Sequence, residues 1–128
     1  MSDKKTVLIV TDGAEKTVKM AKIIAGALKG NKVQIREACE FVGTDLLPAD
    51  VLFIGCEEPS LKSFDNLYEM LQHINLAGRT CGLFSPSKKA GQYLKTMIKS
   101  SEAALNAELL SSEKSDEILE WTAKVITK

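Results

Sequence analysis

The sequence has few aromatic residues, one histidine, three cysteines and no excess of charge of either sign. The cysteines, Cys39, Cys56 and Cys81, form no Cys-x-x-Cys pair, so neither a disulfide framework nor a thiolate zinc site is expected. Seventeen basic side chains balance seventeen acidic ones, which argues against a nucleic acid or an anionic membrane surface as a partner. No apolar run approaches the roughly 18 residues that a membrane-spanning helix needs.

The rest of the composition is typical of a soluble globular protein. The 128 residues are 45% apolar and 27% charged, which predicts a single domain over residues 1–128 with a core of its own. The segment Met1–Lys5 is polar and leads into a short strand-like run, unlike the apolar region of a signal peptide. We therefore expect a cytoplasmic protein.

Strand-like and helix-like patterns alternate along the chain, which predicts an α/β domain. The expected strands are Lys5–Val10, Lys32–Arg36, Asp50–Gly55, Arg79–Phe84 and Ala104–Leu110. The expected helices are Ala14–Lys29, Leu61–Asn75, Lys88–Ser100 and Ser112–Thr127, the last with Ser112 as its N-cap. The segment Cys39–Leu47 is ambiguous and is interpreted as a short or irregular helix.

The strands differ in a way that predicts their order. The first, third and fourth are continuously apolar, as strands covered on both faces are, whereas the second and fifth alternate and suit the edges. A five-stranded parallel sheet of order 2-1-3-4-5 satisfies both conditions, and right-handed crossovers place helices on both of its faces. Because both edge strands are short, nothing in the sequence requires a dimer, and we expect a monomer.

In this order the chain changes direction between strands one and three, and a ligand is expected outside their carboxyl ends. The first loop there carries hydroxyls, a glycine and a lysine before a helix, which favours phosphate binding by Thr11, Asp12, Gly13, Ala14, Glu15, Lys16 and Thr17. An alternative interpretation of the same loop is a helix start at which Asp12 or Thr11 caps the backbone.

Two further loops are expected at this edge, as candidate binding sites for a flat ring. They contain Cys56, Glu57, Glu58, Pro59 and Ser60, and Ser85, Pro86 and Ser87. Alternative interpretations are a solvated carboxylate pair in the first of them, and a plain turn with Pro86 at the first helical position in the second. Cys56 is a weak candidate for a catalytic thiol, because no His or Arg is adjacent to lower its pKa.

With these motifs the chain resembles the short-chain flavodoxins over nearly its whole length. The resemblance is carried by TVLIVTDGAEKTVKMAKIIAGAL at 6–28, LPADVLFIGCEEPS at 47–60 and INLAGRTCGLFSPS at 74–87. It implies non-covalently bound flavin mononucleotide (FMN), with the phosphate on Thr11–Thr17 and the ring between the other two loops. It also implies electron transfer with a redox partner protein. Neither ring loop carries the Trp or Tyr that the family uses for stacking, so Phe84 or Pro59 would have to replace it.

Two other functions remain open. One is a flavodoxin-like binding or regulatory module without flavin, which the missing aromatic residues favour. The other is an enzyme with a different phosphate-bearing ligand, although the sequence offers no acid–base or nucleophile constellation. Whether the protein is an enzyme is uncertain, and a non-catalytic carrier or binding module is the preferred interpretation.

Overall fold

A computed structural model describes residues 5–38, 49–57, 79–99, 104–105 and 108–126, with Asp65, Leu67 and Glu69. The strands are β1 (Thr6–Thr11), β2 (Lys32–Glu37), β3 (Val51–Gly55), β4 (Thr80–Phe84) and β5 (Ala104–Leu105). The helices are α1 (Glu15–Ala27), α4 (Lys88–Lys99) and α5 (Ser115–Ile126). The ambiguous segment 39–47 and most of the expected helix 61–75 lie outside the described residues.

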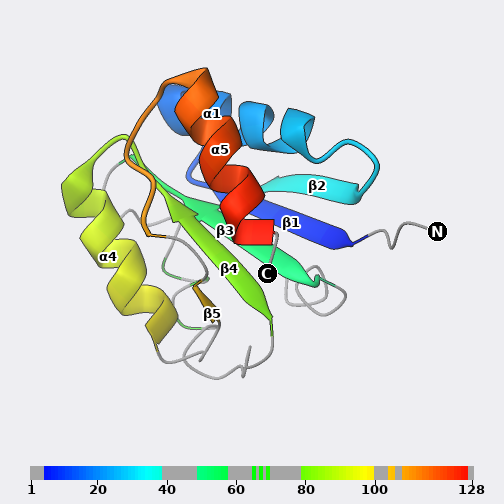
Figure 1. Ribbon diagram of the computed structural model, residues 1–128. Helices are drawn as coiled ribbons and strands as arrows, with labels where there is room; N and C mark the ends of the chain where they lie inside the picture. Colours follow the sequence, from blue (N-terminus) through cyan, green and yellow to red (C-terminus); the bar gives the residue numbers. More distant parts are fainter. Residues whose placement is uncertain are drawn as a thin grey trace.

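The five strands form one parallel sheet of order β2-β1-β3-β4-β5, which confirms the predicted α/β architecture. Helices α1 and α5 lie side by side on one face of this sheet, and α4 covers the other (Figure 1). All of β3 and most of β1 and β4 are buried, whereas β2 is mostly exposed, as expected for an edge strand. Among the described residues, no helix is long and apolar enough to cross a membrane.

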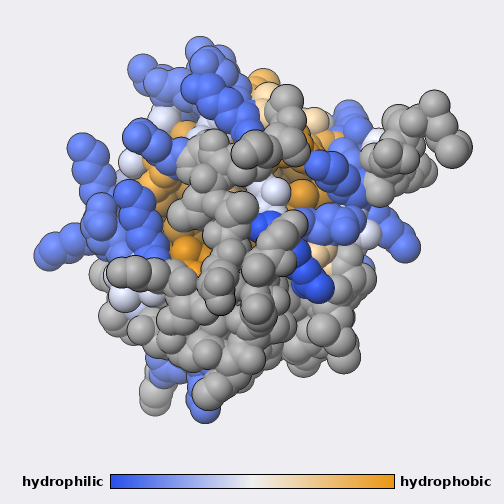
Figure 2. Space-filling view, turned by 60° about the horizontal axis from the view of Figure 1, so that its bottom comes forward, coloured by the Kyte–Doolittle hydropathy of each residue, from blue (hydrophilic) through white to orange (hydrophobic). Residues whose placement is uncertain are grey.

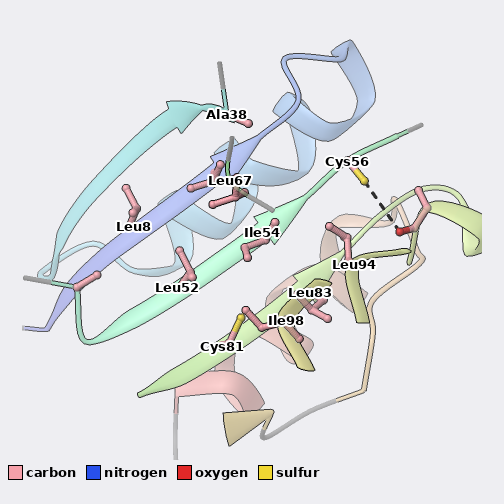
Figure 3. Close-up of a cluster of buried hydrophobic side chains, with 13 residues drawn as sticks. Leu8, Ala38, Leu52, Ile54, Cys56, Leu67, Cys81, Leu83, Leu94 and Ile98 are labelled. Atoms are coloured by element: carbon pink, nitrogen blue, oxygen red, sulfur yellow. Dashed lines mark hydrogen bonds between the residues drawn. The ribbon is translucent and has the colours of Figure 1, made fainter. Parts of the chain in front are cut away.

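Alternate side chains of the buried strands build two cores, one on each face of the sheet. Leu8 and Leu52 belong to the core under α4, together with Leu94 and Ile98 of that helix (Figure 3). The intervening residues of the same strands point into the second core, which is lined by Val7, Ile9, Val51, Phe53, Ile24, Ile118 and Trp121. The period of two in a strand thus explains why continuously apolar strands need helices on both faces.

On the face shown in Figure 2, hydrophilic residues lie mostly around the rim, and some hydrophobic residues are visible between them. On α1, Thr17, Met20, Ala21 and Ile24 are buried, whereas Val18 is only half-buried. On α5, the buried residues are Ile118, Trp121, Thr122 and Val125.

Two element boundaries correct the sequence prediction. Within the expected strand Ala104–Leu110, the described residues form β5 at Ala104–Leu105, while Glu108 and Leu109 are in no strand. Leu110 forms a separate bridge, in which its N–H donates to the Leu83 carbonyl at 3.0 Å. The last helix begins at Ser115, because the Lys114 carbonyl accepts the first helical hydrogen bond, from Ile118 N–H. Ser112 is therefore not the N-cap.

Candidate functional site

The strand register brings the ends of β1, β3 and β4 to one level. Thr11 pairs with Gly55, and Gly55 pairs with Phe84, so the three loops expected at the ligand site leave the same edge of the sheet. The structure describes residues 12–14, 56–57 and 85–87 of these loops, and α1 begins at once with Glu15, Lys16 and Thr17. Glu58, Pro59 and Ser60 lie outside the described residues.

The loop after β1 folds back on its own side chains. Thr11 Oγ1 accepts the N–H of Gly13 at 3.2 Å, and Asp12 Oδ1 accepts the N–H of Ala14 at 3.0 Å. Both are tight turns between residues two apart and precede the helix. Thr11 and Asp12 thus bind backbone N–H groups just before the helix, as the alternative interpretation expects, although the N-cap itself is Ala14, which offers no side-chain acceptor.

Gly13 has a φ of +81°, in the left-handed region that favours glycine. A Cβ at this position would also meet the carboxylate of Glu37, the last residue of β2. Sequence reasoning missed Glu37, which is brought to the site by its pairing with Thr11 across β1 and β2. The only signal that could have found it is the register of those two strands.

Asp12 joins the loops after β1 and β3. Its Oδ2 accepts the N–H of Glu57 at 2.7 Å, while its Oδ1 accepts the N–H of Ala14. One half-buried carboxylate therefore receives two backbone donors, one from its own loop and one from a residue 45 positions away in sequence. Hydrogen bonds to an ionised acceptor are shorter and stronger than neutral ones, and the 2.7 Å distance is in that range.

Thr17, in the first turn of α1, is fully buried, and its Oγ1 has no hydrogen-bond partner. A buried hydroxyl that forms no hydrogen bond costs about 1–3 kcal/mol. Thr122 on α5 is equally buried, but its Oγ1 donates to the Ile118 carbonyl at 2.8 Å. Burial in a helix therefore does not by itself leave a threonine hydroxyl unpaired, and the unpaired hydroxyl of Thr17 is specific to the start of α1 among the described residues.

Cys56, directly after β3, is fully buried. Burial first, and then the negative charge of Asp12, raise the pKa of its thiol to about 12. Its Sγ points to the carbonyl of Ala90, at 4.0 Å (Figure 3). A protonated, enclosed thiol is a poor nucleophile, which argues against a catalytic role for Cys56.

The loop after β4 is satisfied by its own residues. Ser85 Oγ donates to the Ser87 carbonyl at 2.8 Å and accepts the N–H of Ser87 at 3.0 Å. The hydroxyl of Ser87 accepts the N–H of Ala90 at 3.4 Å and so caps α4. Pro86 therefore precedes the cap and does not occupy the first helical position, which corrects that part of the alternative interpretation.

Aromatic stacking is not offered by the described parts of the ring loops, residues 56–57 and 85–87. Phe84, the possible substitute, is fully buried and makes an edge contact with Trp121, with ring centroids 6.3 Å apart. It therefore belongs to the core under α1 and α5.

An open groove of about 800 Å³ lies beside α5, and none of the described residues that line it belongs to the loops after β1 and β3. It adjoins the loop after β4, since the N–H of Ser85 donates to the Leu110 carbonyl at 2.8 Å. Across the part of the chain that the structure describes, no group of three or more His, Cys, Asp or Glu is placed to hold a metal ion.

Comparison with solved structures identifies the fold. A short-chain flavodoxin associated with a non-canonical PDU bacterial microcompartment superposes with a TM-score of 0.84, over 98% of both chains, at 14% identity. The chain has the flavodoxin fold. Oxidised flavodoxin 1 from Bacillus cereus gives a TM-score of 0.82 at 20% identity, over 97% of this chain and 98% of that one.

A third similar structure is Fusobacterium nucleatum flavodoxin bound to flavin mononucleotide. Its TM-score is 0.76 at 15% identity, over 96% of this chain and 98% of that one. No protein-family model matches the sequence, and a search of curated proteins finds no match. The flavodoxin fold is thus shared almost end to end, although few residues are identical.

Proposed function

We propose that this protein binds FMN non-covalently at the carboxyl edge of its sheet and transfers electrons with a redox partner protein. The observation that carries the proposal is the flavodoxin fold over 98% of the chain, together with the meeting of its loops at the end of β1, β3 and β4. The bound FMN of the Fusobacterium nucleatum flavodoxin adds support from a structure of the same fold.

In this proposal the segment Thr11–Thr17 holds the phosphate, and the loops that begin at Cys56 and Ser85 hold the flavin ring. The N-terminus of α1 favours an anion through its backbone donors and its dipole. The unpaired hydroxyl of Thr17 fits the same role, because a phosphate oxygen would give it an acceptor. When bound, FMN supplies reversible redox chemistry, and the protein supplies binding and orientation.

A flavodoxin-fold binding or regulatory module without flavin is the second candidate. It is favoured because the Asp12 carboxylate already accepts the backbone N–H groups of Ala14 and Glu57. The described residues of the two proposed ring loops, 56–57 and 85–87, also include no aromatic side chain. Negative charge from Glu37 beside Gly13 acts in the same direction, since it repels a phosphate.

Absorbance spectroscopy of the purified protein, followed by titration with FMN under fluorescence detection, separates the two candidates. An FMN binder shows visible flavin bands or saturable quenching, and it binds FMN more tightly than riboflavin, which lacks the phosphate. A colourless protein that leaves the fluorescence of both flavins unchanged would contradict FMN binding and favour the flavin-free module.

A further inference from the structure

The two backbone donors that Asp12 holds belong to the loops in which the phosphate and ring of FMN are proposed to sit. The Ala14 N–H comes from the start of α1, and the Glu57 N–H comes from the loop after β3. A phosphate at a helix N-terminus is bound by such outward-pointing N–H groups. The carboxylate and a phosphate would therefore compete for the Ala14 N–H at the start of α1.

We propose that the Asp12 carboxylate is an internal competitor for phosphate, which closes the loops after β1 and β3 until a phosphate-bearing ligand displaces it. This inference rests on the proposed function, since it names a control on the same site. The residue that exerts this control is Asp12, through its hydrogen bonds to the N–H groups of Ala14 and Glu57.

Thr17 provides a second, independent observation. Its hydroxyl lies in the first turn of α1, is shielded from solvent, and has no partner. A phosphate reaches this oxygen only if the surrounding loop shifts. Displacement of the Asp12 carboxylate would break its hydrogen bonds to the N–H groups of Ala14 and Glu57, which hold that loop in place. The closed loop and the unpaired hydroxyl thus fit one arrangement, in which the loop opens to bind.

The electrostatics around Asp12 agree with a closed arrangement. The charge of Asp12 contributes to the raised pKa of Cys56, whose backbone follows β3 directly, so the carboxylate lies close to both loops. Glu37 borders Gly13 from the β2 side. An incoming phosphate therefore meets negative charge on this side of the loop until Asp12 moves away.

Titration of isotope-labelled protein with inorganic phosphate, followed by NMR of the backbone amides, tests the competition without any flavin. The variants are Asp12→Ala, which removes both acceptors, and Asp12→Asn, whose amide oxygen keeps one acceptor while its nitrogen cannot accept the second N–H. Glu37→Gln, at the end of β2 beside Gly13, removes one negative charge next to the loop without touching either hydrogen bond and serves as the matched control.

We expect both Asp12 variants to bind phosphate at least about tenfold more tightly than the wild type, the size expected for a lost charge-assisted competitor. The shifted amides should be those of Gly13, Ala14, Thr17 and Glu57. Glu37→Gln should gain clearly less. Equal phosphate affinity in the wild type and Asp12→Asn, or an equal gain in Glu37→Gln, would overturn the proposal, as would the absence of phosphate binding in every variant.

Titration of the same proteins with FMN and riboflavin separates this inference from the proposed function. If Asp12→Asn binds phosphate at the loop but neither protein binds FMN, the competition stands and FMN binding fails. If the wild type binds FMN and Asp12→Asn leaves the preference for FMN over riboflavin unchanged, FMN binding stands and the competition fails. Circular dichroism confirms that each variant is folded before titration.

Discussion

The loops after β1 and β4 leave the same edge of the sheet and both contain a buried hydroxyl residue, yet their polar groups are satisfied differently. Ser85 exchanges two hydrogen bonds with Ser87, and Ser87 caps α4, so that loop closes without a charge. The loop after β1 relies on the carboxylate of Asp12, which reaches to Glu57, and it leaves Thr17 unpaired. The difference distinguishes a loop that is closed by its own hydroxyls from one that, under the proposed function, accepts a phosphate.

The largest expected effect concerns Gly55, the last residue of β3, which pairs with the ends of both strands that carry these loops, Thr11 of β1 and Phe84 of β4. A Cβ at Gly55 would overlap the ring of Phe84, and Phe84 is held in the core by Trp121. We expect Gly55→Ala to lower the free energy of unfolding by about 1–3 kcal/mol, as overpacking does. Denaturant unfolding measures this change. Gly26→Ala on α1, where a Cβ meets open space, should raise stability instead, and a neutral Gly55→Ala would contradict the packing argument.

The self-satisfied loop after β4 should respond mainly in stability. Ser85→Ala leaves the N–H and carbonyl of Ser87 without their partner, at a cost of about 1–2 kcal/mol in the free energy of unfolding. Thermal or denaturant unfolding tests it. An unchanged stability would mean that water replaces both hydrogen bonds, and the contrast between the two loops would then disappear.

Thr17 should respond in the opposite way. Thr17→Val removes a hydroxyl that forms no hydrogen bond, so stability should be unchanged or rise by up to about 1 kcal/mol, while FMN affinity falls roughly tenfold. The matched control is Thr122→Val, which loses a real hydrogen bond and should lower stability by about 1 kcal/mol. Equal stability losses in both variants would show that Thr17 has a partner in solution.

The smallest effect at neutral pH concerns Cys56. The pKa of its thiol is raised to about 12 in the folded state, above the ordinary value of 9.0, so the folded protein retains a proton that the unfolded chain loses. Stability is therefore fully present below pH 9 and falls as pH rises from 9 towards 12. Burial also raises the pKa of Cys81, so Cys56→Ala should reduce the fall without removing it. Unfolding across alkaline pH measures it, and an identical fall in the variant would be contrary evidence.

The architecture could be predicted because it depends on patterns within short segments. Apolar runs such as Val7–Val10 and Val51–Ile54 require cover on both faces, and the alternating segment at Val33 and Ile35 suits an edge. That contrast predicted the strand order, which is confirmed. The end of the chain was harder, because alternation at Ala104–Leu110 does not reveal where pairing with β4 stops.

The candidate site could be located from the sequence, but its internal contacts could not. Loop composition pointed to Thr11–Thr17, yet the bond from Glu57 to Asp12 joins residues 45 positions apart. The position of Glu37 beside Gly13 has the same origin. Such contacts depend on the strand register, and a one-residue slip would change all of them.

The sequence by itself determined the α/β class, the strand order and the edge at which the loops gather, because hydrophobic periodicity acts within each element. Only the tertiary structure decided which loop is closed by its own hydroxyls and which by the Asp12 carboxylate, which reaches across to the loop after β3. It also decided that Thr17 is buried without a partner, and that Cys56 is enclosed and protonated. These outcomes depend on hydrogen bonds and burial among residues that only the folded sheet brings together.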